Sequence, residues 1–293
     1  MDFLPMSIDL ANQIVTGLLT GLVYSLMALG LSVIFGVVRV VNFAHGEMTA
    51  LAMYAAWALF SWLELDPLIG LPLIALLLFA LGYVMQRGLI DAFVSKPEHM
   101  QFILLVAVAI VMVNGSLLVF GPDAHGIQVP YGFDTYEVGP LLVDKVRLLA
   151  AVAALAISGL LMLFFRHTMT GKAIRACADN LVGAKVIGLN VKQLYAVTFG
   201  IGSACVGAAG ALLAMLIDVM PSSGPELTML AFIIVIVGGL GSMGGALLGG
   251  ILIGISEVLA GYFLMPSMKS MFSFAILILV LILRPQGLMG ARK

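Results

Sequence analysis

Four polar residues stand close together in a chain that is otherwise strongly apolar. Arg39, Asn42, His45 and Glu47 fall within nine positions, in the stretch RVVNFAHGE. A histidine and a glutamate two positions apart project from different faces of a helix, so this pair does not form half of a metal site. The HExxH, GxSxG and Walker glycine-lysine motifs are absent from the sequence. These observations predict no catalysis by this chain, no metal site and no cofactor of its own.

The composition places these polar residues in a membrane protein. Hydrophobic residues make up 62% of the 293 and charged residues only 10%, whereas roughly a quarter of a soluble domain is charged. A bilayer core accepts a helix of roughly 20 apolar residues, and apolar blocks of that length recur along the chain. The net charge of -1 gives no basis for binding nucleic acid. We therefore expect an all-α integral membrane protein with one transmembrane domain over residues 1–293, in contact with membrane lipid.

Nine apolar stretches predict a polytopic bundle of about 8–9 transmembrane helices. The predicted helices cover residues 11–35, 47–63, 67–86, 101–120, 147–165, 193–217, 228–240, 245–263 and 268–283.

The basic residues predict the orientation of these helices. Eleven of them fall on alternate connections or at the C-terminus: Arg39, Arg87, Lys96, Arg166, Lys172, Arg175, Lys185, Lys192, Arg284, Arg292 and Lys293. The other three are Lys145, Arg147 and Lys269. Because loops rich in Lys and Arg remain in the cytoplasm, we expect the C-terminus and the 166–192 loop there, and the N-terminus outside.

A glycine-rich stretch makes the number of spans ambiguous. VIVGGLGSMGGALLGGILIG, from Val235 to Gly254, fits a tight hairpin, a re-entrant pair of half-helices or one broken span. One broken span would move the N-terminus to the other side. The glycines serve either close helix packing or irregular backbone that lines a cavity, and for the second role we single out Gly238, Gly239 and Gly241.

The polar cluster at 39–47 also has two interpretations. A charge at the centre of a bilayer costs about 3 kcal/mol or more, so it faces a bundle interior or an aqueous path, or it lies at the interface. In the first interpretation Arg39 snorkels to the surface, Asn42 caps a helix and Glu47 lies near the helix N-terminus. In the second, the polar residues line a gate or translocation path. Glu257 is a further candidate for that path, or an interfacial residue near the outer surface.

The longest interior connection predicts a short amphipathic helix, capped by Thr170 or Gly171. Ile174, Cys177, Ala178 and Leu181 follow i, i+3, i+4, i+7 spacing and form one apolar face. A helix this short depends on packing for its stability. It either lies flat on the inner leaflet or inserts into a groove on a soluble partner.

Four stretches carry a resemblance to a known family. They read LTGLVYSLMALGLSVIFGVVRVVNFAHGEM, RACADNLVGAKVIGLNV, VGGLGSMGGALLGGILIGISE and LILRPQGLMG. Together, and in this order over roughly residues 12–290, they resemble the LivH-like permease family of branched-chain amino-acid ABC importers. The resemblance implies a bacterial-type inner-membrane complex of two permeases, identical or homologous, two cytoplasmic ATPases that bind the ATP, and an external substrate-binding protein. Members carry leucine, isoleucine and valine, and close relatives carry urea or short amides.

Under that resemblance, residues 171–189 are similar to the coupling helix that docks on the ATPase. The expected coupling residues are Ile174, Arg175, Cys177, Leu181, Gly183, Ala184, Lys185 and Gly188. The family's glutamate is replaced in the stretch Val182-Gly183-Ala184, so docking is expected to depend on apolar fit and on Arg175 or Lys185. The expected path or gate residues are Arg39, Asn42, His45, Glu47, Gly238, Gly239, Gly241 and Glu257.

A secondary carrier or channel that works without ATP is the alternative function. Broken helices with glycines and buried acids also suit that class. A carrier does not need a coupling segment, which therefore discriminates between the two.

Overall fold

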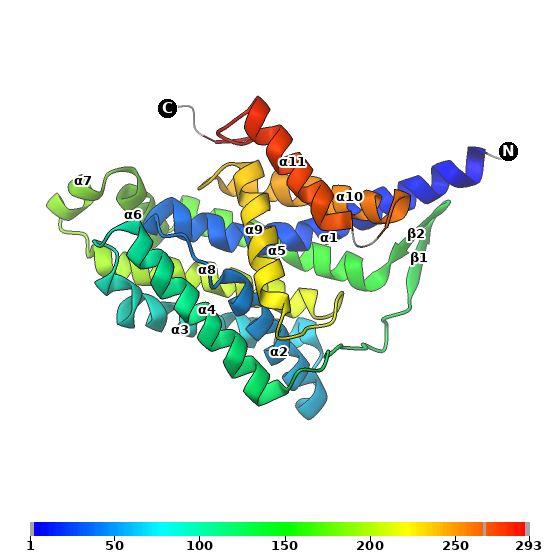
Figure 1. Ribbon diagram of the computed structural model, residues 1–293, viewed down its shortest axis with the longest axis horizontal. Helices are drawn as coiled ribbons and strands as arrows, with labels where there is room; N and C mark the ends of the chain where they lie inside the picture. The colour runs from blue at the N-terminus through cyan, green and yellow to red at the C-terminus, as the bar shows by residue number, and fades with distance from the viewer. Residues whose placement is uncertain (1–2, 266–267, 291–293) are drawn as a thin grey trace.

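The computed structural model describes residues 3–265 and 268–290, which form a helical bundle with one small hairpin (Figure 1). The first helices are α1 (Phe3–Val38), α2 (His45–Leu63), α3 (Pro67–Gly88), the short 3-10 helix η1 (Ile90–Ala92) and α4 (Glu98–Phe120). The strands β1 (Thr135–Val138) and β2 (Leu141–Asp144) precede α5 (Lys145–His167), α6 (Met169–Asp179) and α7 (Leu181–Val186). The remaining helices are α8 (Val191–Leu213), α9 (Ser223–Gly238), α10 (Met243–Phe263) and α11 (Lys269–Leu283).

Each of the nine apolar stretches corresponds to a helix in the structure. Six helices are long and apolar enough to cross a membrane by length and composition, namely α1, α3, α4, α5, α8 and α10. The apolar helices α9 and α11 are shorter, at 16 and 15 residues, and α2 has 19 residues. The largest difference in length is at α1, which covers Phe3–Val38 rather than residues 11–35, and α8 ends at Leu213 rather than at residue 217.

Close packing of small residues holds the longest helices together. A Cβ on Gly21 of α1 would lie 2.7 Å from the carbonyl oxygen of Gly250 on α10. The same close approach joins α3 to α8, where a Cβ on Gly207 would lie 3.0 Å from the carbonyl oxygen of Ile74. Small residues allow backbones to approach this closely, and dispersion contacts then stabilise the pair. These two helix pairs make the most extensive helix contacts in the described part of the chain.

The loop between α4 and α5 contains the hairpin that the sequence analysis did not predict. β1 and β2 are antiparallel, with Thr135 opposite Asp144 and Val138 opposite Leu141. The Tyr131 hydroxyl donates a hydrogen bond of 2.7 Å to Asp66, whose carboxylate also caps α3. Burial and this hydrogen bond raise the pKa of Tyr131. The description of the fold as all-α is therefore wrong for this one loop, which is fixed to the bundle.

The glycine-rich stretch is two helices joined by a tight turn, not one continuous span. α9 ends at Gly238 and α10 begins at Met243, with positive φ at Gly239 (110°) and Gly241 (79°) between them. In Figure 1, α10 runs alongside α1, whereas α9 crosses the direction of α1. The backbone N–H groups of Leu288 and Met289 donate to the carbonyls of Val237 and Gly238. The chain after α11 therefore provides hydrogen-bond donors for the last two carbonyl groups of α9.

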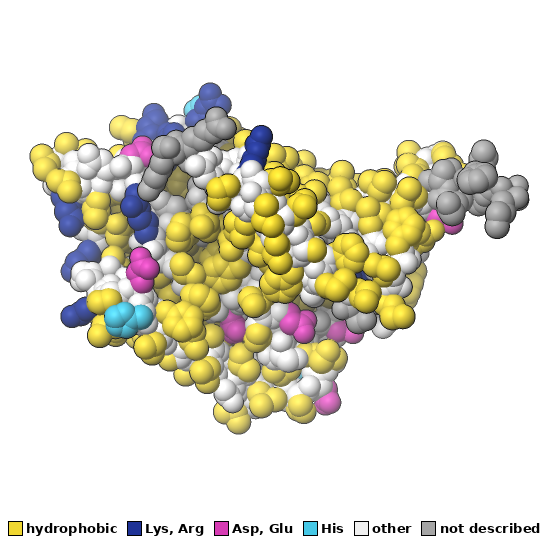
Figure 2. Space-filling model, turned by 45° about the horizontal axis from the view of Figure 1, so that its top comes forward, with side chains coloured by type: hydrophobic (Ala, Val, Ile, Leu, Met, Phe, Trp, Pro, Cys, Tyr) yellow, Lys and Arg dark blue, Asp and Glu magenta, His cyan; other side chains and the backbone are white. Residues whose placement is uncertain are grey.

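Basic residues gather at one end of the molecule. Figure 2 shows Lys and Arg side chains concentrated at the end that carries α6 and α7 in Figure 1. The N-terminal part of α1 and the β1–β2 hairpin lie at the opposite end (Figure 1). Arg292 and Lys293, which the sequence analysis counted with the basic end, lie outside the described residues.

Candidate functional site

Residues 39–44 form a non-helical connection between α1 and α2. Arg39 has a left-handed backbone (φ 57°) and ends α1, after which the segment returns into the bundle before α2 begins. Asn42 is fully buried, and its Oδ1 accepts a 3.1 Å hydrogen bond from the backbone N–H of Ala44. Ala44 is the N-cap residue of α2 and makes no side-chain cap, so the expectation that Asn42 caps this helix is wrong. Asn42 instead stabilises the turn that precedes the helix.

His45 connects the start of α2 to the middle of α1. Its ring is fully buried, and Nε2 lies 3.0 Å from the carbonyl oxygen of Met27. Because a carbonyl only accepts hydrogen bonds, Nε2 carries the proton in this contact. Unlike Nε2, the buried Nδ1 has no hydrogen-bond partner among the described residues. His45 therefore acts as a structural donor between two helices.

Glu47 connects α2 to α9. It is only 6% exposed, and one carboxylate oxygen accepts a 3.1 Å hydrogen bond from the Thr228 hydroxyl. The Thr228 hydroxyl in turn accepts a 2.8 Å bond from the backbone N–H of Gly46. A Cβ on Gly46 would collide with the Gly224 carbonyl oxygen and with Thr228. The two helices are thus in direct backbone contact, and the hydroxyl of Thr228 satisfies polar groups on both sides of it.

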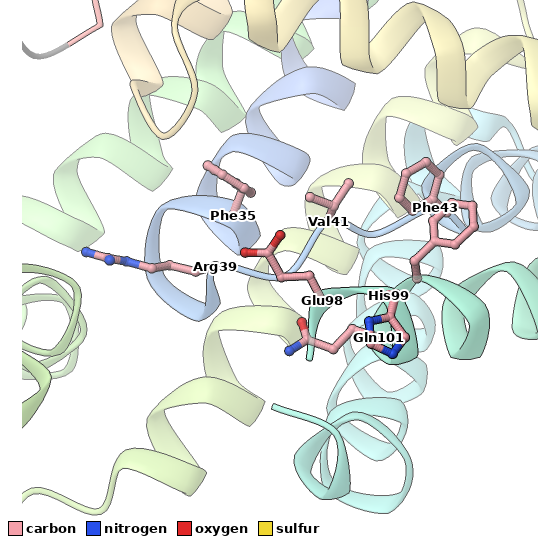
Figure 3. A pocket seen from close by; sticks show the side chains of 8 residues that line it. Phe35, Arg39, Val41, Phe43, Glu98, His99 and Gln101 are labelled. Carbon is pink, nitrogen blue, oxygen red and sulfur yellow. The ribbon is translucent and has the colours of Figure 1, made fainter. Parts of the chain in front are cut away.

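Arg39 belongs to a different environment from the other three residues of the cluster. Its side chain is exposed, and in Figure 3 the guanidinium points away from the neighbouring side chains. The ion pairs among the described residues are Lys145–Asp134 and Arg147–Asp144. Arg39 therefore forms no ion pair with Glu47, and the cluster seen in the sequence divides into one exposed residue and three buried ones.

Three cavities each share lining residues with the next, and α9 lines two of them, so we call the row that they form the α9 groove. The first of them, which we call the inner cavity, has a volume of about 580 Å³ and is shown in Figure 3. In that view the Glu98 carboxylate points toward the 39–41 segment. The cavity is lined by Phe35, Arg39, Val41, Phe43, Glu98, His99, Gln101 and Phe102. The middle cavity, of about 330 Å³, has only apolar side chains: Leu31, Phe35, Val41, Phe43, Met229, Phe232, Ile236 and Leu240. Phe35, Val41 and Phe43 line both of these cavities. They therefore form the wall between the two.

The outer cavity is the largest of the three, at about 610 Å³, and shares Met229 with the middle one. Its polar lining comes from four helices and the loop before α9, and includes Tyr24, Asp218, Glu226, Glu257, Lys269 and Ser273. Glu257 on α10 accepts a 3.0 Å hydrogen bond from the Ser273 hydroxyl on α11. The groove thus has charged groups at both ends and an apolar middle.

An aromatic contact closes the groove between its middle and inner cavities. The Phe43 ring meets Phe102 of α4 edge to face at 4.6 Å between centroids, and it meets Phe232 of α9 at 5.2 Å. Such pairs are worth about 0.5–1.5 kcal/mol each beyond their buried area. Phe43 therefore bridges α4 and α9 between the inner and middle cavities.

The structure separates the expected path residues into two groups. Arg39 lines the inner cavity and Glu257 the outer one, while Glu47 borders a small gap beside Tyr54. Asn42, His45, Gly238, Gly239 and Gly241 line none of the three cavities. The sequence analysis missed Thr228 and Phe43, because one hydroxyl or one aromatic ring in an apolar stretch is not distinctive. From the sequence, Lys269 was expected only to contribute to the orientation of the helices.

The expected coupling segment is two helices rather than one. Thr168, not Thr170 or Gly171, caps α6, and its hydroxyl accepts a 3.0 Å hydrogen bond from the Gly171 N–H. Asn180 then interrupts the helix, and its side chain caps α7 through the Gly183 N–H at 2.8 Å. Gly188 follows α7 with a positive φ of 83°. The i, i+3, i+4, i+7 pattern therefore crosses a helix boundary.

The apolar face predicted for this segment points into the protein. Ile174 is 0% and Cys177 3% exposed, because α6 packs on α1, α5 and α8. Ala184 of α7 is also buried. Burial also raises the pKa of the Cys177 thiol, which keeps it protonated. The expectation that Ile174 and Leu181 share one exposed docking face is therefore wrong.

A different apolar surface faces outward at this end, and we call it the α7 surface. It consists of Leu181, Val182, Val186 and Ile187, which are 38%, 73%, 80% and 71% exposed. Arg175 and Lys185 are exposed beside it.

Comparisons with known proteins give this architecture a family. The family model described as "Branched-chain amino acid transport system / permease component" matches residues 13–281. The permease protein BraD of the high-affinity branched-chain amino acid transport system of Pseudomonas aeruginosa is 30% identical over 95% of both chains. The corresponding LivH of Salmonella typhimurium is also 30% identical, over 95% of both chains.

More distant likenesses extend the comparison. LivM of Escherichia coli, another permease protein of that transport system, is 24% identical over 92% of this chain and 68% of its own. The solved structure of PsaBC from Streptococcus pneumoniae in complex with Fab aligns over 92% of this chain at 14% identity, with a TM-score of 0.49. On the extent of the match and the identity to BraD and LivH, this multi-pass membrane protein belongs to the family of branched-chain amino acid transport system permease components.

Proposed function

We propose that this chain is a transmembrane subunit of an ATP-binding cassette importer that moves branched-chain amino acids across the inner membrane. The observation that carries the proposal is the α9 groove, which runs from a charged outer cavity through an apolar middle to a charged inner cavity. The printed names of BraD and LivH support the class of substrate. The chain has no catalytic role, and ATP is bound by partner subunits.

Nine of the described helices are apolar and at least 15 residues long, namely α1, α2, α3, α4, α5, α8, α9, α10 and α11. We infer that each of them crosses the membrane once. Nine crossings place the two chain ends on opposite sides, and the basic end defines the cytoplasmic side. The N-terminus is then outside and the C-terminus inside.

The α7 surface is the contact for the ATPase in this proposal. Exposed apolar side chains on a membrane protein beyond its apolar belt indicate an interaction site, and here they have Arg175 and Lys185 beside them. α6 fixes the α7 surface to the bundle, since its buried face contacts α1, α5 and α8. Motion of the ATPases on ATP binding therefore reaches the transmembrane helices through α6. A second permease subunit and an external substrate-binding protein complete the importer.

In this proposal the substrate crosses the membrane when the α9 groove changes its width. The Phe43 contacts with Phe102 and Phe232 keep the inner cavity separate from the middle one in this structure. Because Glu47 and Thr228 join α2 to α9, movement of α9 carries the start of α2 with it. ATP shifts the balance between outward-open and inward-open states only through the different affinity of the ATPases for the two states.

A carrier or channel that works without ATP remains the second candidate, since glycine-broken helices and intramembrane acids also suit that class. The test is uptake of radiolabelled L-leucine by proteoliposomes that contain this chain, its second permease, the ATPases and the binding protein. Under the proposal, uptake requires ATP and all components, and each omission abolishes it. Uptake by this chain alone, driven by an ion gradient and indifferent to ATP, would establish the carrier instead.

A further inference from the structure

The outer cavity contains two charged residues of opposite sign on facing helices. Glu257 lies on α10 and Lys269 at the start of α11, and both line the cavity. A Cβ on Gly261, one turn after Glu257, would lie 2.8 Å from Cε of Lys269. Since residues i and i+4 share one face of a helix, the Lys269 side chain lies over the face of α10 that carries Glu257. The Lys269 side chain therefore lies about one helical turn from Glu257 along α10.

Neither charge is neutralised by an ion pair in the part of the chain that the structure describes. The two ion pairs found there involve other residues. The Glu257 carboxylate is held by the Ser273 hydroxyl, one turn after Lys269 on α11. This bond orients the carboxylate without cancelling its charge. An acid and a base that face one cavity without pairing with each other can each bind a ligand group of the opposite charge.

The remaining walls of the cavity suit an aliphatic side chain. Leu227 and Ile233 of α9 are buried and face the cavity, with Leu230 and Phe274 beside them. Asp218 and Glu226 are exposed at the same cavity, so acids outnumber bases three to one among these residues. An excess of one sign in a cleft attracts the opposite charge on a ligand. The cavity therefore attracts an ammonium group first, while it also offers one cationic partner and an apolar wall.

We propose that the outer cavity is a binding site of the permease itself for a free zwitterionic amino acid with an aliphatic side chain. The Lys269 ammonium binds the ligand carboxylate, the Glu257 carboxylate binds the ligand ammonium, and the α9 wall takes the side chain. The substrate class rests on the proposed function. The site adds a selection step within the membrane subunit, after release from the external binding protein.

The test measures occupancy of the cavity directly. Ser270 lines the cavity, and the natural Cys177 and Cys205 are buried, so Ser270→Cys supplies one reactive thiol. The assembled importer in nanodiscs is labelled with an impermeant maleimide, with and without millimolar L-leucine. We expect leucine to slow labelling several-fold. Isoamylamine, which lacks the carboxylate, and 4-methylpentanoate, which lacks the amine, should protect far less at equal concentration.

Further variants assign the protection to the two charges. Glu257→Gln keeps an oxygen that accepts from Ser273 but removes the charge, and Lys269→Met keeps the length of the side chain. Each, in the Ser270→Cys background, should abolish protection by leucine. Glu137→Gln removes another acid at the same end of the molecule, on the exposed strand β1, and should leave protection intact.

Three results would overturn the site. The first is protection by leucine that survives both charge variants, and the second is equal protection by isoamylamine and leucine. The third is a thiol that reacts in the isolated chain but not in the importer, because the second permease or lipid then covers the cavity. Uptake of labelled leucine in matched proteoliposomes separates this inference from the proposed function. Uptake without protection refutes only the binding site, whereas protection without uptake refutes only the importer.

Discussion

Residues 39–47 and the α7 surface both interrupt a regular apolar pattern, but their side chains face opposite surroundings. Asn42, His45 and Glu47 are polar and buried, and each has a partner within the chain. Val182, Val186 and Ile187 are apolar and exposed at the end of the molecule where basic residues gather. Buried polar groups with hydrogen-bond partners elsewhere in the chain indicate a contact between its own segments. Apolar groups that face outward beyond the spans indicate a missing partner.

This difference separates two kinds of functional segment. The contacts of residues 42–47 fix α2 to α1 and α9, so substitutions there should affect folding first. The α7 surface is attached through the buried residues of α6, so changes on it should act on assembly and leave folding alone. The predictions below test that division.

The largest effect is expected at Gly46, where α2 meets the backbone of α9. Gly46→Leu would place a side chain against the Gly224 carbonyl and Thr228, neither of which is the free end of a flexible side chain. Overpacking of this kind costs typically about 1–3 kcal/mol, and more where the neighbour is backbone. We expect little or no monodisperse protein after detergent extraction, measured by fluorescence-detected size-exclusion chromatography.

Gly115→Leu is the matched control for this prediction. Gly115 is also a helical glycine, on α4, and a Cβ there meets nothing within 4 Å. This variant should elute as the wild type does. Equal behaviour of the two variants would show that α2 and α9 are not in close contact.

An intermediate effect is expected on the α7 surface. The double variant Val186→Asp, Ile187→Asp should elute normally but lose binding to the ATPases by about 2 kcal/mol or more, on the order of 30-fold. Co-purification and substrate-stimulated ATP hydrolysis measure this loss. Val138→Asp, at another exposed apolar position but on β1, should assemble normally. Normal ATPase binding by the double variant would remove the coupling role from α7.

The smallest effect is expected at Thr228. Thr228→Val preserves shape but removes the hydroxyl that serves both the Gly46 N–H and the Glu47 carboxylate. Leaving such buried groups unsatisfied costs about 1–2 kcal/mol. We expect a lower temperature of thermal unfolding in detergent, and Thr228→Ser should restore most of the loss. An unchanged unfolding temperature for the valine variant would mean that water replaces the hydroxyl.

Sequence patterns were sufficient for the class of protein and for its helices. Long apolar stretches have few outcomes in a bilayer, because every backbone polar group must be satisfied within a helix. For the same reason each of the nine predicted stretches is helical. The glycine-rich stretch left a hairpin, a re-entrant pair and one broken span open, and the structure has a turn there in which Gly239 and Gly241 adopt backbone conformations that few other residues tolerate. The family resemblance was confirmed by the match over residues 13–281.

Only the tertiary structure decided which way the side chains of the short segments face. Ile174 and Leu181 have helical spacing, but the cap at Asn180 separates them, and packing of α6 on the bundle buries the first of them. Arg39 and Glu47 are close in sequence, but Arg39 has a left-handed backbone and a non-helical segment follows it. Arg39 therefore lies at the surface, whereas Glu47 contacts α9. The α9 groove is formed by residues from distant parts of the chain, so no local pattern contains it. Local sequence sets the conformation of each helix, whereas burial and the satisfaction of polar groups depend on what lies opposite.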